Sequence, residues 1–364
     1  MPDLSEYRQL AKDMSVDAVA LVPGPNFTRA LGKPFMSHER PFVVVIPAEG
    51  APAAIVPNLE LGSWALVGFK GAVFDWRDQT GYDDAFAALA AHMPLSSLAV
   101  EGQVMRVFVS KALTRAMPGL RIVDGEREIS GLRIIKTDED IAALQAAIDV
   151  SERALTRVIE DVHVGQTEKQ IEQSLIQALF AEGAESLAFT PIVAAGDNSA
   201  QPHGKARADY QLKPGDALLF DFGARKHGFV ADITRTFFIE EVSNEGRAVY
   251  DTVLRANLAG FEACRAGVTA HDIDDAVISV LEASPYADRI RTKTGHGLGR
   301  DVHEAPYIMR GNDQKILPGM VWTNEPGLYD LDNFGVRIED DVLVTQDGCR
   351  SLTRFPKDLT IIGR

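Results

Sequence analysis

The chain has 364 residues, of which 46% are hydrophobic and 24% charged, with a formal net charge of −15 and a sequence pI near 5.0. This length exceeds one typical core and predicts two domains. The acidic balance argues against a nucleic-acid or anionic-membrane partner, because both require a basic surface. No stretch approaches the roughly 20 apolar residues of a membrane span, and the charged N-terminal segment is typical of a helix rather than a signal peptide. A cytoplasmic protein is therefore expected.

The first third of the chain alternates short apolar runs with helical patterns, which predicts an α/β domain over residues 1–126. The apolar runs lie at residues 16–22, 41–57 and 97–102, and a helical pattern lies at 110–118. The middle run predicts a hairpin that turns at Glu49-Gly50. A polar segment at residues 123–131 marks the boundary, and the second domain is expected over 131–364.

A repeated pattern organises this second domain. Residues 165–176 (GQTEKQIEQSLI) and 267–278 (GVTAHDIDDAVI) both predict a glycine turn followed by a threonine-capped amphipathic helix. A longer helix is expected to open at Thr137, with acidic residues in its first turn. Each repeat precedes a strand-rich region with a pair of acids, so two related halves are expected to meet around one site.

The first pair of acids is Asp221 and Asp232, in the predicted hairpin LLFDFGARKHGFVADITRTF at residues 219–238. With the turn centred on Lys226 and His227, the two aspartates are equidistant from it and are predicted to be direct cross-strand partners. Such partners share a face, with Cβ atoms roughly 4.5–5.5 Å apart. Two bare anions repel at that spacing, so the pair indicates a cation site.

The second pair is Glu325 and Glu339, predicted to face each other across a loop centred near Asp332. Four carboxylates in one buried site require cations, because each unpaired buried charge costs several kcal/mol. Two divalent ions would balance them. A carboxylate-dominated set favours Mn²⁺ first, with Fe²⁺, Co²⁺ and Zn²⁺ as alternatives. His296, between two glycines that allow close approach of the backbone, is the expected imidazole ligand.

Two further histidines lie in segments suited to catalysis. His203 is on a loop before the first hairpin and His303 follows His296 by seven residues. Either could donate a hydrogen bond to a developing oxyanion. The remaining histidines are interpreted as surface or structural residues: His38, His92, His163, His227 and His271. The two cysteines, Cys264 and Cys349, offer at most one disulfide and are interpreted as ordinary buried thiols.

Several segments together resemble the pita-bread metallopeptidases, specifically the Xaa-Pro branch that contains prolidases and aminopeptidases P. They are GLRIIKTDEDIAAL, DFGARKHGFVADITRTF, TGHGLGRDVHEAP, NEPGLY and GVRIEDDVLVT. The resemblance is strong over residues 131–364 and extends to the first 125 or so only in general layout. It implies an N-terminal creatinase-like α/β domain followed by a pita-bread catalytic domain with internal pseudo-twofold symmetry.

Carried onto this sequence, the resemblance implies a ligand set for two metal ions: Asp221, Asp232, His296, Glu325 and Glu339. Asp232 and Glu339 would bridge both ions, and a metal-bridged hydroxide would attack the carbonyl of an Xaa-Pro bond. Glu325 is implied as the proton shuttle. His303 and His203 would steady the oxyanion or the substrate carbonyl, and Arg337 would place the substrate or order the acids.

The resemblance leaves the exact activity open. An Xaa-Pro dipeptidase is favoured because the chain is compact, with an Xaa-Pro aminopeptidase as the alternative; the substrate is a peptide or dipeptide with proline second. More remote alternatives are a methionine aminopeptidase, a pita-bread protein with non-peptidase chemistry and a binding module. One departure from the family is Thr292, where relatives often carry a histidine, so the substrate subsite there is expected to differ. Relatives are commonly homodimers, which implies the same state here.

Overall fold

The structure is a computed structural model that describes residues 2–363. The chain forms two compact units, the first ending at Arg133 and the second beginning at Ile134. The polar segment at residues 123–131 holds the end of a strand and a short helix, so it lies in the first unit. None of the helices in residues 2–363 combines the length and the apolar character needed to cross a membrane.

The first unit is built on a mixed sheet with both faces buried. Its strands lie in the order β4 (Ala72–Trp76), β3 (Ala53–Pro57), β2 (Val43–Pro47), β1 (Ala18–Leu21), β5 (Ser97–Val100) and β6 (Arg121–Asp124). Its helices are α1 (Ser5–Asp13), α2 (Pro25–Leu31), η1 (Asn58–Glu60), α3 (Leu61–Ala65), α4 (Asp83–His92), α5 (Val107–Ala116) and α6 (Glu126–Gly131). Val44 and Ile46 pack with α1 and α2, whereas Val43 and Val45 pack with α4 and α5. Strands β1, β2 and β3, which are covered on both faces, are apolar and buried along their whole length.

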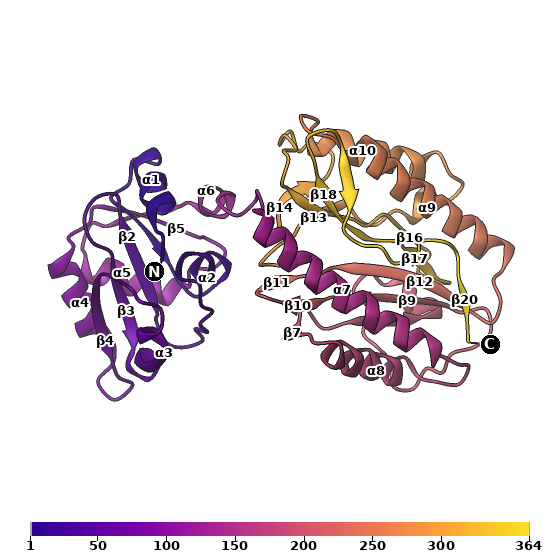
Figure 1. Ribbon diagram of the computed structural model, residues 1–364, viewed down its shortest axis with the longest axis horizontal. Coiled ribbons are helices and arrows are strands. Elements are labelled where there is room, and N and C mark those ends of the chain that lie inside the picture. The colour runs from indigo at the N-terminus through magenta and orange to yellow at the C-terminus, as the bar shows by residue number, and fades with distance from the viewer. Residues whose placement is uncertain (1, 364) are drawn as a thin grey trace. The chain divides into compact units, whose positions relative to one another are not determined.

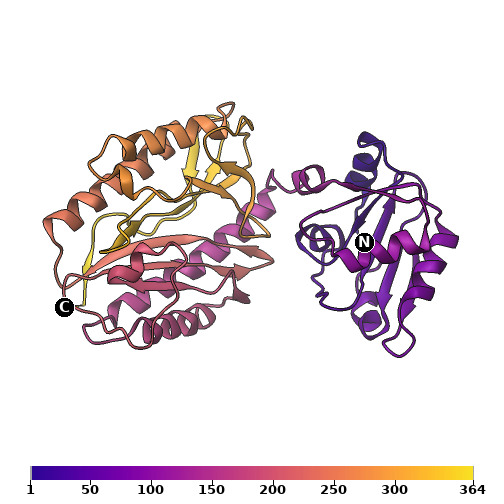
Figure 2. The same cartoon turned by 180° about the vertical axis from the view of Figure 1, so that it is seen from behind.

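The second unit holds its strands between two pairs of helices. Figures 1 and 2 show α7 (Asp138–Glu160) and α8 (Glu168–Ala181) on one side, and α9 (Asn244–Ala263) and α10 (Ala270–Glu282) on the other. One sheet has the order β20 (Ile361–Ile362), β12 (Ile233–Ile239), β9 (Ala217–Phe222), β8 (Ile192–Ala195), and another the order β14 (Glu304–Ile308), β13 (Gly295–Gly297), β15 (Val321–Asn324), β18 (Asp340–Val344), β19 (Cys349–Ser351). Shorter elements are β7 (Ser186–Leu187), β10 (Ala224–Lys226), β11 (Phe229–Val230), β16 (Gly327–Tyr329), β17 (Gly335–Arg337), η2 (Gly196–Ala200) and η3 (Ala287–Arg289).

The repeated sequence pattern forms the same local structure in both halves of this unit. Thr167 caps α8 and Thr269 caps α10, each through a capping box, as predicted. Before each cap a glycine donates its backbone N–H to a distant carbonyl: Gly165 to Leu212 at 3.0 Å and Gly267 to Ile316 at 2.9 Å. Both glycines have a positive φ, near 90°, which suits a residue without a Cβ.

The hairpin that carries Asp221 differs from the prediction. His227 and Gly228 both have positive φ and form the two-residue turn between β10 and β11, so the turn lies one residue later than expected. Hairpins favour such turns because their twist matches that of the strands. The direct partner of Asp221 is therefore Thr234, not Asp232. The prediction of a direct pair is wrong, although the shift by two residues keeps Asp232 near the same face of the hairpin.

The second predicted hairpin has the expected register. Gly327 pairs with Arg337 and Tyr329 with Gly335, and β15 pairs with β18 in the same register, with Asn324 opposite Asp340. Glu325 lies just beyond β15 and Glu339 just before β18, so the two glutamates occupy facing positions between these paired segments.

Two buried carboxylates, one in each half, fix the segments that carry the site histidines. Glu168, at the first residue of α8, accepts the backbone N–H groups of Ala195 at 2.7 Å and Arg207 at 2.6 Å, which flank the loop of His203. Asp274 in α10 accepts those of Thr294 at 2.9 Å and Arg310 at 3.0 Å, which flank the segment of His296 and His303. In each half, one helix carboxylate thus holds together the two ends of a segment that carries a site histidine.

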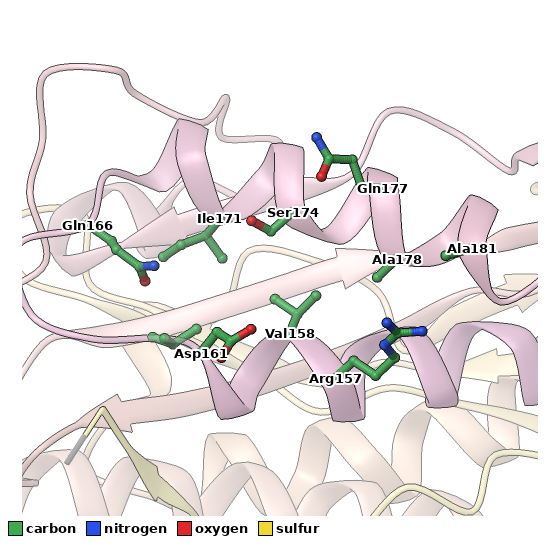
Figure 3. A pocket seen from close by; sticks show the side chains of 10 residues that line it. Arg157, Val158, Asp161, Gln166, Ile171, Ser174, Gln177, Ala178 and Ala181 are labelled. Carbon is green, nitrogen blue, oxygen red and sulfur yellow. The ribbon is translucent and has the colours of Figure 1, made fainter.

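A groove of about 340 Å³ lies between α7 and α8, and none of the predicted site residues lines it. Figure 3 shows Val158 from α7 and Ile171 from α8 pointing into it, with Asp161 and Gln166 near one end. It is distinct from the cavity that holds the predicted ligands.

The hydrogen bonds that Glu168 accepts from both ends of the His203 segment, called the Glu168 clamp, predict a large contribution to the stability of the second unit. Glu168→Ala leaves a cluster of donors around Arg207 without an acceptor, so we expect the second unit to lose about 3–5 kcal/mol of unfolding free energy. The measurement is urea unfolding followed by Trp322 fluorescence in a Trp64→Phe/Trp76→Phe background, which leaves the reporter in the second unit alone. Exposed Glu160→Ala is the control, expected to change stability by less than about 0.5 kcal/mol. Equal effects of the two substitutions would contradict the clamp.

Candidate metal centre

Three of the predicted ligands converge closely in the second unit. Asp232, His296 and Glu339 are buried, and each offers a ligand atom within 4.8 Å of the others. His296 Nε2 lies 3.7 Å from Asp232 Oδ2 and 3.2 Å from Glu325 Oε1, which brings a fourth predicted ligand to the same place. Segments more than 100 residues apart in the chain thus supply one compact set of donor atoms.

The ligands come from strands or from the junctions between them. Asp221 lies on β9 and Asp232 between β11 and β12, both in the first half of the unit. His296 lies on β13, Glu325 between β15 and β16, and Glu339 between β17 and β18, all in the second half. Thr234 and Glu339 form a β-bridge that joins the two halves at the site. Rigid strands therefore hold the donor atoms in place.

Asp221 is connected to the others through Arg337. The Arg337 guanidinium is buried, donates from Nη2 to Asp221 Oδ2, and donates from Nη1 to the hydroxyl of Tyr329 at 2.9 Å. The other carboxylate oxygen of Asp221, Oδ1, is buried and has no hydrogen-bond partner among residues 2–363. A buried carboxylate oxygen with a free lone pair is what a bound cation would satisfy.

Two threonine hydroxyls that were not predicted from the sequence orient the glutamates. Thr234 Oγ1 donates to Glu339 Oε2 at 2.5 Å and accepts from Arg337 Nε at 3.0 Å. Thr323 Oγ1 donates to Glu325 Oε1 at 3.0 Å and accepts the backbone N–H of His296 at 3.1 Å. Each threonine is two residues from an acid of the set, so period-two alternation along the strand was the available signal.

Burial and mutual repulsion perturb two of the carboxylates strongly. Burial raises the pKa of Asp232 well above its ordinary value, and the charges of Glu339 and Asp221 raise it further. Burial likewise raises the pKa of Glu339 well above its ordinary value, together with the charges of Glu325 and Asp221. Without cations these groups would bind protons. Four carboxylates with one imidazole therefore fit divalent cations.

Glu325 is the exception among the acids. Burial alone would raise its pKa, but the hydrogen bond and charge of His296, with the charge of Arg337, lower the pKa below its ordinary value. Glu325 therefore stays ionised where Asp232 and Glu339 tend to be protonated. An ionised carboxylate that lies beside an imidazole and faces a cavity can accept a proton from a nearby water.

The set opens onto a cavity of about 630 Å³, large enough for a small peptide. Its lining includes the ligands Asp221, Asp232, His296 and Glu325, the apolar residues Phe189, Ile192, Pro202 and Val302, and the polar residues His203, Arg291, Thr292, Lys293, His303 and Arg337. The structure thus places His203, His303 and Arg337 at the same cavity, whereas His38, His92, His163, His227 and His271 do not line it.

His303 lies at the exposed side of the cavity, against the ring of His296. The two ring centroids are 4.1 Å apart and nearly perpendicular, at 72°. Partial burial, with the charge of His296, lowers the pKa of His303 to about 4. The ring is therefore neutral near pH 7 and can offer one N–H donor to a ligand in the cavity.

The chain is similar to known proteins along both units. Residues 142–346 match the metallopeptidase family M24, and residues 4–135 match the creatinase/prolidase N-terminal domain. Three solved structures are similar over nearly their full length. A prolidase from Thermococcus sibiricus has 30% identity, covers 99% of this chain and 98% of that one, and superposes with a TM-score of 0.93.

The other two give comparable values. The dipeptidase PepE from Mycobacterium ulcerans has 32% identity, covers 99% and 96% of the two chains, and gives a TM-score of 0.90. The X-Pro aminopeptidase from Thermotoga maritima has 28% identity, covers 100% of both chains and gives a TM-score of 0.86. These findings confirm the predicted fold class and family resemblance. The chain belongs to the metallopeptidase family M24 and carries a creatinase/prolidase N-terminal domain.

Proposed function

We propose that this chain is a metal-dependent Xaa-Pro dipeptidase. The observation that carries the proposal is the convergence of Asp232, His296 and Glu339 within 4.8 Å, and two of them, Asp232 and His296, line a cavity of about 630 Å³. The names of similar proteins, prolidase and dipeptidase PepE, support the substrate class. The similarity to an X-Pro aminopeptidase keeps that activity as the second candidate.

Five side chains would hold two divalent ions: Asp221, Asp232, His296, Glu325 and Glu339. Mn²⁺ is the proposed metal, because carboxylate-dominated sets suit it. When bound, such ions lower the pKa of a water molecule and polarise a substrate carbonyl. The unsatisfied Oδ1 of Asp221 and the raised pKa values of Asp232 and Glu339 support this assignment.

The protein's own side chains have distinct proposed roles. Glu325, whose pKa is lowered, accepts the proton of the attacking water and passes it to the leaving proline nitrogen. His303 and His203, which line the cavity, donate hydrogen bonds to the oxyanion that develops on the scissile carbonyl. Arg337 orders the acids, because its donors already engage Asp221, Thr234 and Tyr329.

The remaining proposals concern location, assembly and domain limits. Cys264 and Cys349 are both free thiols, which suits the reducing cytoplasm that we propose as the location. The homodimer implied by the family resemblance stays a prediction. The proposed domain limits are 1–126 for the N-terminal domain and 131–364 for the catalytic domain.

Metal removal tests the proposed centre. We expect chelated protein to lose hydrolysis of Ala-Pro and to regain it with Mn²⁺, because the acids need cations to act as ligands. Asp232→Ala and Glu339→Ala should not regain activity, whereas exposed Asp251→Ala should. Mn²⁺ should also raise the Tm of the wild type and of Asp251→Ala but not of the ligand variants. Full activity after complete chelation would rule out the metal mechanism.

Peptide length separates the two candidate activities. Steady-state hydrolysis of Ala-Pro and Ala-Pro-Ala is compared on the same Mn²⁺-loaded enzyme. For a dipeptidase we expect kcat/KM for Ala-Pro to exceed that for Ala-Pro-Ala by roughly tenfold or more, since one tenfold step corresponds to about 1.4 kcal/mol of transition-state binding. Preference for the tripeptide would instead assign the aminopeptidase activity.

The lowered pKa of His303 gives a pH prediction. A histidine with a pKa of about 4 is neutral above that pH, so its protonation should not shape the rate between pH 5.5 and 8. His303→Ala should lower kcat by roughly 100-fold through loss of an oxyanion donor, yet leave the shape of the kcat/KM profile unchanged in that range. Loss of an ionisation near pH 6–7 in the variant would show that His303 is protonated in the working enzyme.

A further inference from the structure

Two cations in the exposed part of the cavity lining, called its mouth, have no acidic partner among residues 2–363. Arg291 and Lys293 are exposed, and both line the cavity. Among residues 2–363, neither forms an ion pair with a carboxylate. By contrast, the third cation of the lining, Arg337, is buried and paired with Asp221. The charges of Arg291 and Lys293 are therefore available to a ligand in the cavity.

The contacts of the two side chains leave this charge uncompensated. Arg291 Nη1 donates to the backbone carbonyls of Asp288 and of Ile290, the latter at 3.0 Å. Lys293 Nζ lies 5.8 Å from the centre of the Tyr307 ring. Carbonyl oxygens and an aromatic face hold a cation in place without neutralising it.

Thr292, between the two cations, is directed to a different partner. Its hydroxyl is a hydrogen-bond partner of Tyr329, which also accepts from Arg337 at 2.9 Å. The segment is thus tied to the buried network through its middle residue, while its neighbours remain at the mouth. This is also the segment that leads into His296, so the two cations lie three and five residues before a proposed metal ligand.

The cavity therefore separates charges. The buried and partly buried part of its lining, its floor, carries Asp221, Asp232 and Glu325, and the exposed part carries Arg291 and Lys293. A dipeptide is a zwitterion whose carboxylate lies one residue, on the order of 3.5 Å, beyond the scissile bond. With the scissile carbonyl at the floor, the mouth cations would attract the carboxylate and repel the amino group.

We propose that Arg291 and Lys293 bind the C-terminal carboxylate of the substrate and thereby determine a preference for dipeptides. This inference rests on the proposed function, because it assigns a subsite within the same cavity. A longer peptide places a neutral amide where the dipeptide places a carboxylate. It therefore loses the charge-assisted hydrogen bonds that a guanidinium or an ammonium offers to a carboxylate.

The test compares Ala-Pro with Ala-Pro-amide, which differ only in the charge of the C-terminal group. The Mn²⁺-loaded variants are Arg291→Gln, Lys293→Gln and the double variant, with Lys315→Gln, an exposed lysine outside the cavity, as the control. Each single variant is expected to raise KM for Ala-Pro roughly three- to fivefold, the double variant roughly tenfold or more, with kcat within about twofold. KM for the amide should change less than about twofold in all variants.

Charge reversal and salt provide independent readouts. Lys293→Glu is expected to favour the amide over Ala-Pro, because a carboxylate at the mouth repels the substrate carboxylate. High salt should raise KM for Ala-Pro in the wild type and have little effect on the double variant, since exposed charges are screened. A merely structural role for the segment would instead raise KM equally for both substrates.

The outcomes distinguish this inference from the function on which it rests. If wild-type enzyme hydrolyses neither Ala-Pro nor Ala-Pro-amide, the proposed function fails, and the inference fails with it. If the wild type hydrolyses Ala-Pro but the cation variants change KM for both substrates equally, or for neither, the inference alone is overturned.

Discussion

The burial of four carboxylates around one point is the constraint on which the second unit depends. Asp221, Asp232 and Glu339 all have raised pKa values because they are buried together, an arrangement that costs free energy unless cations or hydrogen bonds offset it. Arg337 and the hydroxyls of Thr234 and Thr323 compensate part of this cost. Bound metal would offset the rest of this cost. The site is therefore arranged to bind metal, and it lowers the stability of the metal-free protein.

Symmetry explains how one chain brings so many acids together. Each half contributes a glycine turn, a helix with a capping threonine, and acids on or next to neighbouring strands. When two such halves face each other, with Thr234 bridged to Glu339, their acids meet at the shared centre. The histidine-bearing segments are less regular, and each is closed by a buried helix carboxylate, Glu168 in one half and Asp274 in the other. Regular strands thus position the ligands, whereas clamped loops position the residues that face the substrate.

Local pattern was enough to predict α7, α8, α10 and the repeat, and to select five candidate ligands, but it did not predict α9 or the exact register of the first hairpin. The turn was placed on Lys226 and His227, whereas His227 and Gly228 have the positive φ values that such a turn requires. Moving a turn by one residue shifts the pairing by two, which preserves the face of the strand, so the expected clustering of Asp221 and Asp232 survived the error. Thr234, Thr323 and Tyr329 were also missed. Thr234 contacts Glu339 and Arg337 more than 100 residues away, so no local spacing encodes its role. Thr323 contacts Glu325 two residues away and Tyr329 contacts Arg337 eight residues away, and alternation along the strand was the available signal for Thr323.

The feature that distinguishes this enzyme from its relatives lies outside the metal centre. The chain resembles a prolidase and an X-Pro aminopeptidase at nearly equal identity, 30% and 28%, over almost their whole lengths, so the difference between these two activities lies in local groups of the cavity. A metal centre is bound to be similar wherever the chemistry is the same. Substrate length is instead recognised by groups that contact the substrate one residue beyond the scissile bond. In this chain those groups are Arg291 and Lys293, at the cavity mouth on either side of Thr292. In a protein with a net charge of −15, cations without an acidic partner attract an anionic substrate end. Arg291 and Lys293 are therefore placed where a small change in sequence would have the largest effect on specificity and the least on catalysis.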